Sequence, residues 1–414
     1  MTAAPATDLA SERLHGLDAV RGYALLVGIV YHATMSFLPG RPIWVVEDTH
    51  RSLLLSGLFF LSHTFRMTTF FLIAGFFAHM MVEKRGVKGF VKDRAKRILV
   101  PLLVGWPIIF AAIIAASVYG AYVMTGHIPK PPPPNPQAPA LAFPLTHLWF
   151  LYLLLILYGL TLGCRALVLR LDRSGRFRRR ADAALASIVE SPLAPLALAV
   201  PSTLALSFVG PWAKWFGVPT PDNSLLPNIP ALVSYFTAFG FGWLLHRQPG
   251  LINSWTRRWP LNLALALGFT ALCLSMAGVA PLMALEPLGP QRTLFAGVYS
   301  LATWTWTFAV VGMALRFLSN HSPVRRYIAD SSYWLYLIHL PIVMALQAAV
   351  AKLDWPAEVK ILLVLGVAFP LMFASYQFLV RRSFVGAILN GRRAPKAAAE
   401  APPQLAPLAR ETFQ

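Results

Sequence analysis

The segment LDAVRGYALLVGIVYHATMSFL, residues 17 to 38, is apolar and long enough to cross a bilayer, yet it carries Asp18, Arg21 and His32. At about 100° and 1.5 Å per residue, Arg21 and His32 lie on one helix face about 16 Å apart. Ionisable groups in hydrocarbon are costly, so they usually face the bundle interior or a wet cavity. The pattern predicts a polar stripe that faces one site. In the alternative, Asp18 and Arg21 lie among lipid headgroups and His32 bonds a neighbouring helix.

The composition indicates a polytopic membrane protein. Hydrophobic residues make up 57% of the 414 residues and charged residues 13%, and the mean hydropathy is +0.58, which lies outside the range of soluble domains. The first twelve residues, MTAAPATDLASE, lack the basic and apolar regions of a cleaved signal, so we expect the first helix to be an uncleaved anchor.

The cysteine content and the net charge exclude some classes of site. Cys164 and Cys273 are the two cysteines, and they form neither a disulfide framework nor a metal-binding pattern, so we expect no metal site. The net charge of +19 comes from basic residues that cluster in short loops between apolar segments. Such clusters report membrane topology, and we expect no nucleic-acid partner.

The apolar segments predict an all-α polytopic membrane protein with about ten transmembrane helices. They lie near residues 18–38, 53–82, 98–120, 146–169, 183–207, 228–246, 260–279, 291–316, 329–350 and 358–380. On alternate sides of these spans, one side carries 27 of the 36 Lys and Arg residues and the other carries 7. Because basic loops stay inside, both termini are predicted to be cytoplasmic, in a multi-pass protein of a bacterial inner membrane.

Residues 1–390 are predicted to form one transmembrane domain, since no segment between spans is long enough for a soluble domain. The outer loop at residues 126–143, GHIPKPPPPNPQAPALAF, predicts an extended, polyproline-like strap or a plain linker. Residues 391–414 predict a disordered cytoplasmic tail whose basic residues contact anionic lipid.

The second predicted span contains SHTFRMTTFF, residues 62–71, in which His63 and Arg66 share a helix face. Counted from the outer surface, both lie at a depth at which they can meet His32. The spans offer few carboxylates, so Arg66 pairs either with one of those or with a ligand.

The basic loop at residues 83–101, EKRGVKGFVKDRAKRILVP, has two interpretations. It is either a topology signal in contact with lipid, or an anion site formed by Arg94 and Arg97 with Lys92 and Lys96. Arg94 and Arg97 are three residues apart at the expected start of a helix, whose dipole attracts phosphate, and arginine binds phosphoryl oxygens in a bidentate manner.

Two further spans carry polar residues. His147 and Trp149 open the fourth span in THLWFLYLLLILY, where an interfacial aromatic belt also explains Trp149. Tyr333 and His339 lie in SSYWLYLIHLPIVM, residues 331–344, where Pro341 predicts a loosened helix beside His339. These four residues are candidates for lining a cavity or an acceptor site, or His339 simply bonds a carbonyl that the proline leaves free.

Together these segments resemble the membrane acyltransferase-3 family. Its hallmarks are an Arg, ten residues and a His in the first span, matched by Arg21 and His32, and Arg-x-x-Arg before the third span, matched by Arg94 and Arg97. DAVRGYALLVGIVYH, SHTFRMTTFFLIAGFF, DRAKRILVPLL, HLWFLYLLL and SSYWLYLIHLPI are most similar to a glucan-biosynthesis branch that succinylates osmoregulated periplasmic glucans.

The resemblance implies a transmembrane O-acyltransferase with no tightly bound cofactor. It would take a succinyl or acetyl group from cytoplasmic acyl-CoA, that is succinyl-CoA or acetyl-CoA, and deliver it to a hydroxyl of a periplasmic glucan or other glycan. The basic residues of the third-span signature suit the CoA phosphates. His32 suits a general base or an acyl relay. Arg66 or His63 suits an oxyanion, and Asp18 can orient Arg21.

A secondary transporter or lipid-linked glycan flippase is the alternative function, because it also places charges at mid-membrane. The two halves of the chain show no internal similarity, which disfavours a transporter built from repeats. Dependence on acyl-CoA distinguishes the two functions.

Overall fold

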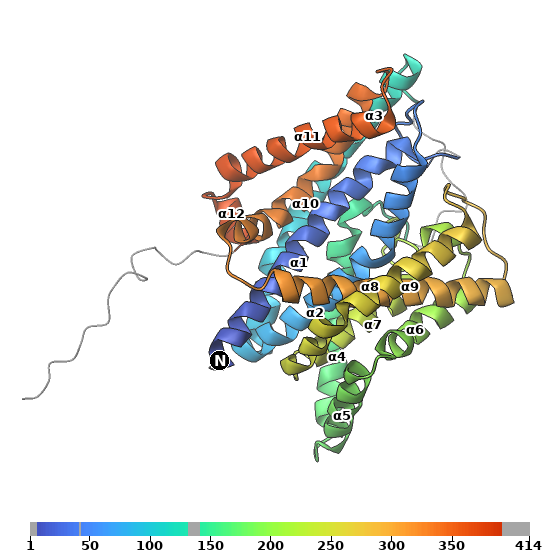
Figure 1. The fold of residues 1–414 in the computed structure, drawn as a ribbon. Coiled ribbons are helices and arrows are strands. Elements are labelled where there is room, and N and C mark those ends of the chain that lie inside the picture. Colours follow the sequence, from blue (N-terminus) through green and yellow to red (C-terminus); the bar gives the residue numbers. More distant parts are fainter. Residues whose placement is uncertain (1–5, 41–42, 131–140, 391–414) are drawn as a thin grey trace, which may run out of the picture.

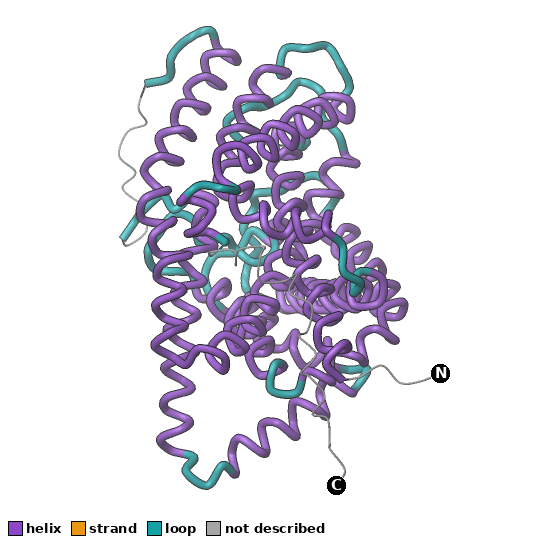
Figure 2. The backbone as a smooth tube through the Cα atoms, turned by 90° about the vertical axis from the view of Figure 1, so that its left-hand side faces the viewer, coloured by secondary structure: helices purple, strands orange, loops and turns teal. Residues whose placement is uncertain are grey.

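The computed structural model describes residues 6–40, 43–130 and 141–390 and gives no side-chain detail before residue 15. These residues are helical almost throughout and contain no strand, only an isolated antiparallel bridge between Ala142 and Ser224 (Figure 2). The predicted all-α class is confirmed. The centre of the Pro-rich loop, residues 131–140, and the predicted tail, residues 391–414, lie outside the described residues.

The helices follow the predicted spans closely. Their bounds are α1 Ala6–Thr34, α2 Leu53–Arg94, α3 Val100–Thr125, α4 Trp149–Leu171, α5 Arg176–Glu190, α6 Ala194–Phe208, α7 Ile229–Leu245, α8 Asn253–Ala277, α9 Pro290–Phe317, α10 Pro323–Val350, α11 Ala357–Ser375 and α12 Phe384–Leu389. Short turns of 3-10 or π-helix adjoin several of them, including Met35–Phe37 and Ala95–Leu99.

The helices form two groups that meet at α1 and α2 (Figure 1). On one side α10 packs against α1, α3 and α11, and on the other side α9 packs against α6 and α8. α2 contacts α1, α7 and α9, so it joins the groups. α1 therefore lies between the two groups.

Six helical segments of the described chain are long and apolar enough to cross a membrane, or seven if the bent pair α5 and α6 is counted as one span. One of the six, Leu53–Thr125, includes both α2 and α3. α7 is apolar but shorter, and α1 is not among the six, because its polar residues lower its hydropathy. A membrane protein is supported. The count of ten spans and the orientation stay predictions.

The basic segment before the third span is helical, and this corrects the expected helix start. α2 is broken at Gly86, whose φ of 66° and ψ of 171° are not helical. From Val87 the chain is helical through the π-turn Ala95–Leu99 and into α3. Arg94 and Arg97 thus lie within a helix, where the backbone N–H groups are bonded to carbonyls. The helix-dipole argument for a phosphate at this position is wrong.

The expected span at 183–207 is also wrong as a single helix. α5 and α6 are separate and meet at a bend of 108°. Ser191 is extended, with a ψ of 140°, as expected of a residue that precedes a proline. α5 begins with the basic sequence RFRRR and protrudes at the lower edge of the molecule in Figure 1.

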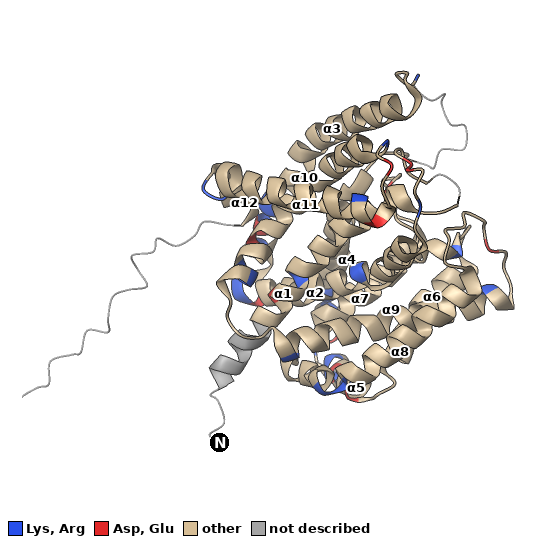
Figure 3. Ribbon diagram, turned by 45° about the horizontal axis from the view of Figure 1, so that its top comes forward, with Lys and Arg blue, Asp and Glu red and all other residues tan. Residues whose placement is uncertain are grey.

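The loop between α1 and α2 is attached to α11 by a buried ion pair. Lys360 Nζ lies 2.7 Å from both carboxylate oxygens of Asp48, and the two side chains are 0% and 1% exposed. Other Lys and Arg residues gather around α12 and α5 (Figure 3).

Candidate active site

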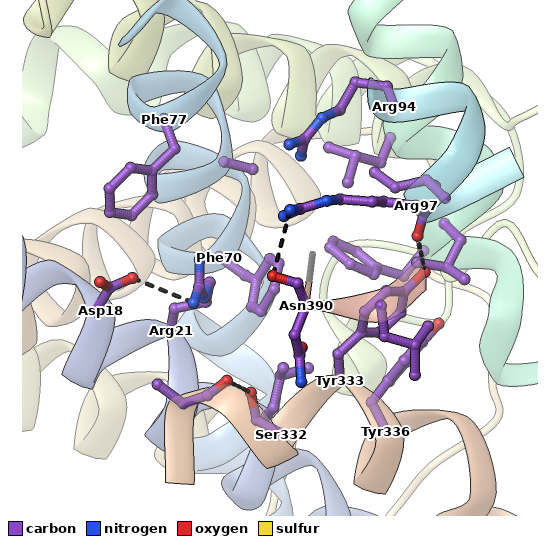
Figure 4. Close-up of a pocket in the computed structure, with 18 of the residues that line it drawn as sticks. Asp18, Arg21, Phe70, Phe77, Arg94, Arg97, Ser332, Tyr333, Tyr336 and Asn390 are labelled. Atoms are coloured by element: carbon purple, nitrogen blue, oxygen red, sulfur yellow. Dashed lines mark hydrogen bonds and ion pairs between the residues drawn. The ribbon is translucent and has the colours of Figure 1, made fainter. Parts of the chain in front are cut away.

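A cavity of about 370 Å³, here called the arginine cavity, opens beside the lower half of α1 (Figure 4). Arg21, Arg94 and Arg97 extend into it from α1, α2 and the π-turn. The other polar residues that line it are Asp18, Tyr158, Asp330, Ser332, Tyr333, Tyr336 and Asn390. Three guanidinium groups in one cavity favour a ligand that carries several negative charges.

A second cavity of about 50 Å³, here called the histidine cavity, adjoins the first. The two share Leu25, Phe70, Phe150 and Tyr336 as lining residues. The histidine cavity is otherwise lined by Ala24, Gly28, His32, Arg66, Met67, His147, Trp149 and His339. A basic cavity is therefore followed by a small one that contains three imidazoles and a guanidinium group.

The stripe on α1, predicted to face one site, runs along two adjoining cavities. Arg21 lines the arginine cavity, Gly28 and His32 line the histidine cavity, and Leu25 lines both. The predicted i, i+3 ion pair is present, because Arg21 Nη2 lies 3.2 Å from Asp18 Oδ1.

One carboxylate orients the arginines of the basic segment. Asp93 lies 2.6 Å from Arg94 Nη2, 3.3 Å from Arg97 Nε and 2.9 Å from Arg85 Nη1. Its side chain is only 8% exposed. Because one negative charge serves three positive ones, the cluster keeps an excess of positive charge at the cavity wall.

The π-turn is hydrogen-bonded to α10 and to the residue that follows α12. Tyr333 Oη donates to the carbonyl of Arg97 at 2.7 Å, and Arg97 Nη2 donates to the carbonyl of Asn390 at 3.3 Å. π-turns are rare and occur often at functional sites. Lys92 and Lys96, by contrast, are exposed and do not line the cavity.

Arg66 is a buried cation without a carboxylate among the described residues. Its side chain is 8% exposed, and its guanidinium carbon lies 4.3 Å from the centre of the Tyr31 ring. Arg66 Nη1 is buried and has no hydrogen-bond partner in the described part of the chain. His63 stacks on the same Tyr31 at 5.3 Å and does not line the histidine cavity. Of the two residues considered for stabilising an oxyanion, Arg66 is the one that lines the same cavity as His32.

Pro341 accounts for the orientation of His147. A proline has no N–H to give to the carbonyl four residues earlier, which is that of Leu337. His147 Nε2 lies 3.1 Å from this carbonyl oxygen. Since a carbonyl only accepts, Nε2 carries the proton and Nδ1 of the neutral ring is bare. The freed carbonyl thus binds His147, whereas one of the two interpretations from the sequence gave this bond to His339.

His339 has one bare nitrogen by the same argument. Its Nδ1 lies 2.7 Å from the carbonyl oxygen of Tyr336, so Nε2 of the neutral ring is the acceptor. His339 Nε2, His147 Nδ1 and His32 Nδ1 are all buried and lack a partner among the described residues. The His339 ring centre lies 5.1 Å from that of His32 and 4.9 Å from that of His147.

Several lining residues were not recognised from the sequence. Tyr336 lines both cavities and donates through Oη to the carbonyl of His147 at 2.7 Å. Gly28 lies one helical turn before His32, a spacing that could have drawn attention to it. Asn390 follows α12, and nothing in its sequence context indicates a site. Trp149 is 8% exposed and lines the histidine cavity, so the aromatic-belt explanation does not apply to it.

The chain matches the family model described as an acyltransferase domain over residues 14–376. The chain belongs to the acyltransferase-3 family. The matched range includes α1 from residue 14, all of α10 and both cavities, apart from the Leu389 and Asn390 side of the arginine cavity. Membership of this family identifies the protein as a membrane acyltransferase.

Among curated proteins, the acyltransferase resembles glucans biosynthesis protein C from Shigella dysenteriae serotype 1 and from Escherichia coli. Each match is 32% identical over 99 residues, which is 24% of this chain and 25% of the relative. The alignment thus spans about a quarter of the length of these relatives. No solved structure matches the chain.

Proposed function

We propose that this protein transfers an acyl group from cytoplasmic acyl-CoA to a hydroxyl of a periplasmic glucan or another glycan. The observation that carries the proposal is the pair of adjoining cavities, one lined by three arginines and the other by three histidines and Arg66. This order suits a donor with a polyanionic head and a reactive thioester at the end of a thin arm.

In this proposal the arginine cavity binds the CoA phosphates. Arg94, Arg97 and Arg21 offer fork-shaped donors, and Asp93 and Asp18 fix the direction in which they point. The pantetheine arm then follows the α1 stripe. Arg21 and His32 are about 16 Å apart along a helix, a distance that an extended arm spans.

The small size of the histidine cavity supports a short acyl group. At about 50 Å³ it holds only a few atoms beyond a thioester, which favours acetyl or succinyl over a long fatty chain. A succinyl group adds a carboxylate, for which Arg66 is a suitable partner.

His32 acts as the general base in the proposed reaction. A sugar hydroxyl attacks the thioester carbon, and its proton passes to the imidazole of His32. The carbonyl oxygen becomes negative and is stabilised by Arg66, whose Nη1 lacks a partner among the described residues. The C–S bond then breaks, and the CoA thiolate takes the proton from His32. His339 Nε2 offers a second acceptor for the incoming hydroxyl.

An acyl-histidine relay uses the same residue in a different order. His32 first attacks the thioester and releases CoA, and the sugar hydroxyl then takes the acyl group from the imidazole. Rapid quenching with labelled acyl-CoA and no acceptor separates the two, since only the relay gives a labelled chain and a burst of free CoA.

The proposed function is tested with purified protein in liposomes, with labelled succinyl-CoA or acetyl-CoA on one side and glucan on the other. We expect free CoA and labelled glucan to appear together. Mass spectrometry of periplasmic glycans from cells with and without the gene identifies the natural product. Transport of an unmodified glycan without consumption of acyl-CoA would overturn the proposal in favour of the flippase.

A further inference from the structure

α2 and α7 cross at very short distance, on the face of α2 that points away from the arginine cavity. A Cβ added at Gly75 would collide with the carbonyl of Phe239, and one added at Gly242 would collide with the carbonyl of Leu72. Small residues at such crossings let two membrane helices pack backbone to backbone. Because the two backbones are so close, the side chains one turn beyond Gly75 on α2 and one turn beyond Gly242 on α7 contact each other.

Those side chains are His79 on α2 and His246 at the end of α7. Their Nδ1 atoms are 2.9 Å apart. Glu83, one turn beyond His79, lies with its two carboxylate oxygens 3.6 Å from His79 Nδ1 and 3.5 Å from His246 Nδ1. Three potential ligand atoms from three side chains thus lie within 4.8 Å of one another.

The geometry fits a small divalent transition-metal ion. In a tetrahedral zinc site with bonds of about 2.0–2.2 Å, neighbouring ligand atoms are roughly 3.3 Å apart. The two Nδ1 atoms are 2.9 Å apart, and each lies 3.5 or 3.6 Å from a different carboxylate oxygen of Glu83, so these separations lie on both sides of this value. Two imidazoles with a carboxylate are ligands that such ions prefer, whereas Mg²⁺ and Ca²⁺ prefer oxygen alone.

The surroundings are those of a site with one open side. The ring of His79 lies 4.8 Å from that of Trp243, and the ring of His246 lies 4.8 Å from that of Phe76. The two imidazoles are therefore enclosed by aromatic side chains, while the Glu83 side chain is 58% exposed. An ion can enter past Glu83 and keep a water as its fourth ligand.

We propose that His79, Glu83 and His246 bind a zinc-class divalent ion that ties α2 to α7. Without the ion one imidazole donates its Nδ1 proton to the other. On binding, that ring moves its proton to Nε2, and both Nδ1 lone pairs face the metal. His79 and His246 are 167 residues apart in the sequence, and none of the three ligands is a cysteine. Neither the cysteines nor a local ligand motif therefore indicated this site.

The proposed role is structural. Glu83 lies just before the break at Gly86, after which the chain leads to Asp93 and Arg94. An ion that fixes α2 to α7 at Glu83 therefore also fixes the position at which the basic segment after Gly86 begins. The cavity-lining residues Phe77 and Met81 lie on the other face of α2, so the ion does not touch the proposed acyl donor. This inference does not depend on the proposed function.

The test uses full-length protein purified through a tag without histidine. Stripped protein is titrated with Zn²⁺ in competition with a chromophoric chelator, and with Co²⁺, whose visible absorption reports a tetrahedral site. We expect one ion per chain and a higher unfolding temperature with Zn²⁺. His246→Gln and Glu83→Gln should each weaken binding at least roughly tenfold.

The exposed His127→Gln is the matched control and should leave Zn²⁺ affinity unchanged. If His246→Gln does not fold, Glu83→Gln and the Co²⁺ spectrum of the wild-type protein still test the proposal, since the Glu83 side chain is largely exposed. Wild-type protein that binds neither ion, with an unfolding temperature unaffected by Zn²⁺, would overturn the proposal. The pair would then be only a hydrogen bond between two imidazoles.

Discussion

At the scale of single residues, hydrogen bonds hold the backbone of His32 and do not involve its imidazole. Gln347 Nε2 donates to the carbonyls of His32 and Ala33 at 3.0 and 3.1 Å, and Trp44 Nε1 donates to Gln347 Oε1 at 2.9 Å. None of these bonds uses the imidazole. A substitution of the side chain therefore changes the reaction far more than the fold.

We expect His32→Gln to lower the transfer rate about 100-fold to 10,000-fold, the usual cost of losing a general base. Binding of acyl-CoA should persist, because the phosphates are proposed to contact the arginine cavity. CoA release and acyl-CoA affinity, measured on the same preparation, check both parts.

His63→Gln is the informative comparison for this variant. His63 lies at a similar depth but behind Tyr31 and outside the histidine cavity, so we expect less than about a tenfold loss of rate. Equal losses in both variants, or retention of more than about a tenth of the wild-type rate in His32→Gln, would contradict the role given to His32.

The second prediction concerns Gly28, because an added Cβ would lie 3.1 Å from Arg66 Nη1. Gly28→Ala should displace the guanidinium group by a fraction of an ångström without unfolding the protein, since the end of an Arg side chain can move. The expected cost is roughly tenfold to 100-fold in rate, because catalysis is sensitive to such misplacement. Transfer rate and unfolding temperature are measured together.

Gly159→Ala is the matched control, since a Cβ at Gly159 meets nothing within 4 Å. It should change neither quantity appreciably. Normal transfer by Gly28→Ala would show that the position of Arg66 is unimportant for the reaction.

At the scale of elements, the basic segment that ends in the π-turn shows what can and cannot be predicted from the sequence. The spacing of Arg94 and Arg97 predicted an anion site as one of two interpretations, and both side chains line the arginine cavity. The predicted start of the third helix was wrong, because a segment as polar as EKRGVKGFVKDRAKR resembles a loop in the sequence. In the structure its apolar side chains pack against the bundle: Phe90 is 1% exposed, and Ile98, directly after the segment, is 5% exposed.

The third prediction is that Arg94→Lys combined with Arg97→Lys weakens acyl-CoA binding without impairing membrane insertion. Lysine keeps the charge but cannot make bidentate contacts with phosphate or with Asp93. We expect at least roughly a tenfold rise in Kd, from the loss of two charge-assisted contacts. Binding of a non-hydrolysable acyl-CoA analogue to purified protein is the measurement.

Arg257→Lys combined with Arg258→Lys, at the beginning of α8 and outside both cavities, controls for a general effect of the exchange. Unchanged affinity in the Arg94 and Arg97 variant would return these residues to the role of a topology signal.

At the scale of the whole molecule, the sequence predicted the helices well but not how they bend or meet. The ten apolar segments correspond to α1 to α4, the α5–α6 pair and α7 to α11. The bend between α5 and α6 was missed because apolarity continues past Pro192. The meeting of His79 with His246 was missed because the two residues are remote in sequence, and only packing at Gly75 and Gly242 joins them.

The fourth prediction is the topology, with ten spans and both termini in the cytoplasm. Alkaline phosphatase fused after Lys130 should be active, and the same enzyme fused after Arg180 should be inactive, because basic loops stay inside. An inactive fusion at Lys130 or an active one at Arg180 would reverse the orientation and with it the side from which the acyl donor enters.

The ion pair between Asp48 and Lys360 also bears on how the chain is assembled during synthesis. Asp48 leaves the ribosome long before Lys360, so the loop between α1 and α2 cannot adopt its final position until α11 has been inserted. A buried charge without its partner costs about 3–5 kcal/mol, enough to keep an unfinished bundle open. Chains that stop after α10 therefore keep the loop between α1 and α2 unattached to α11, and membrane quality-control proteases can recognise such a loop.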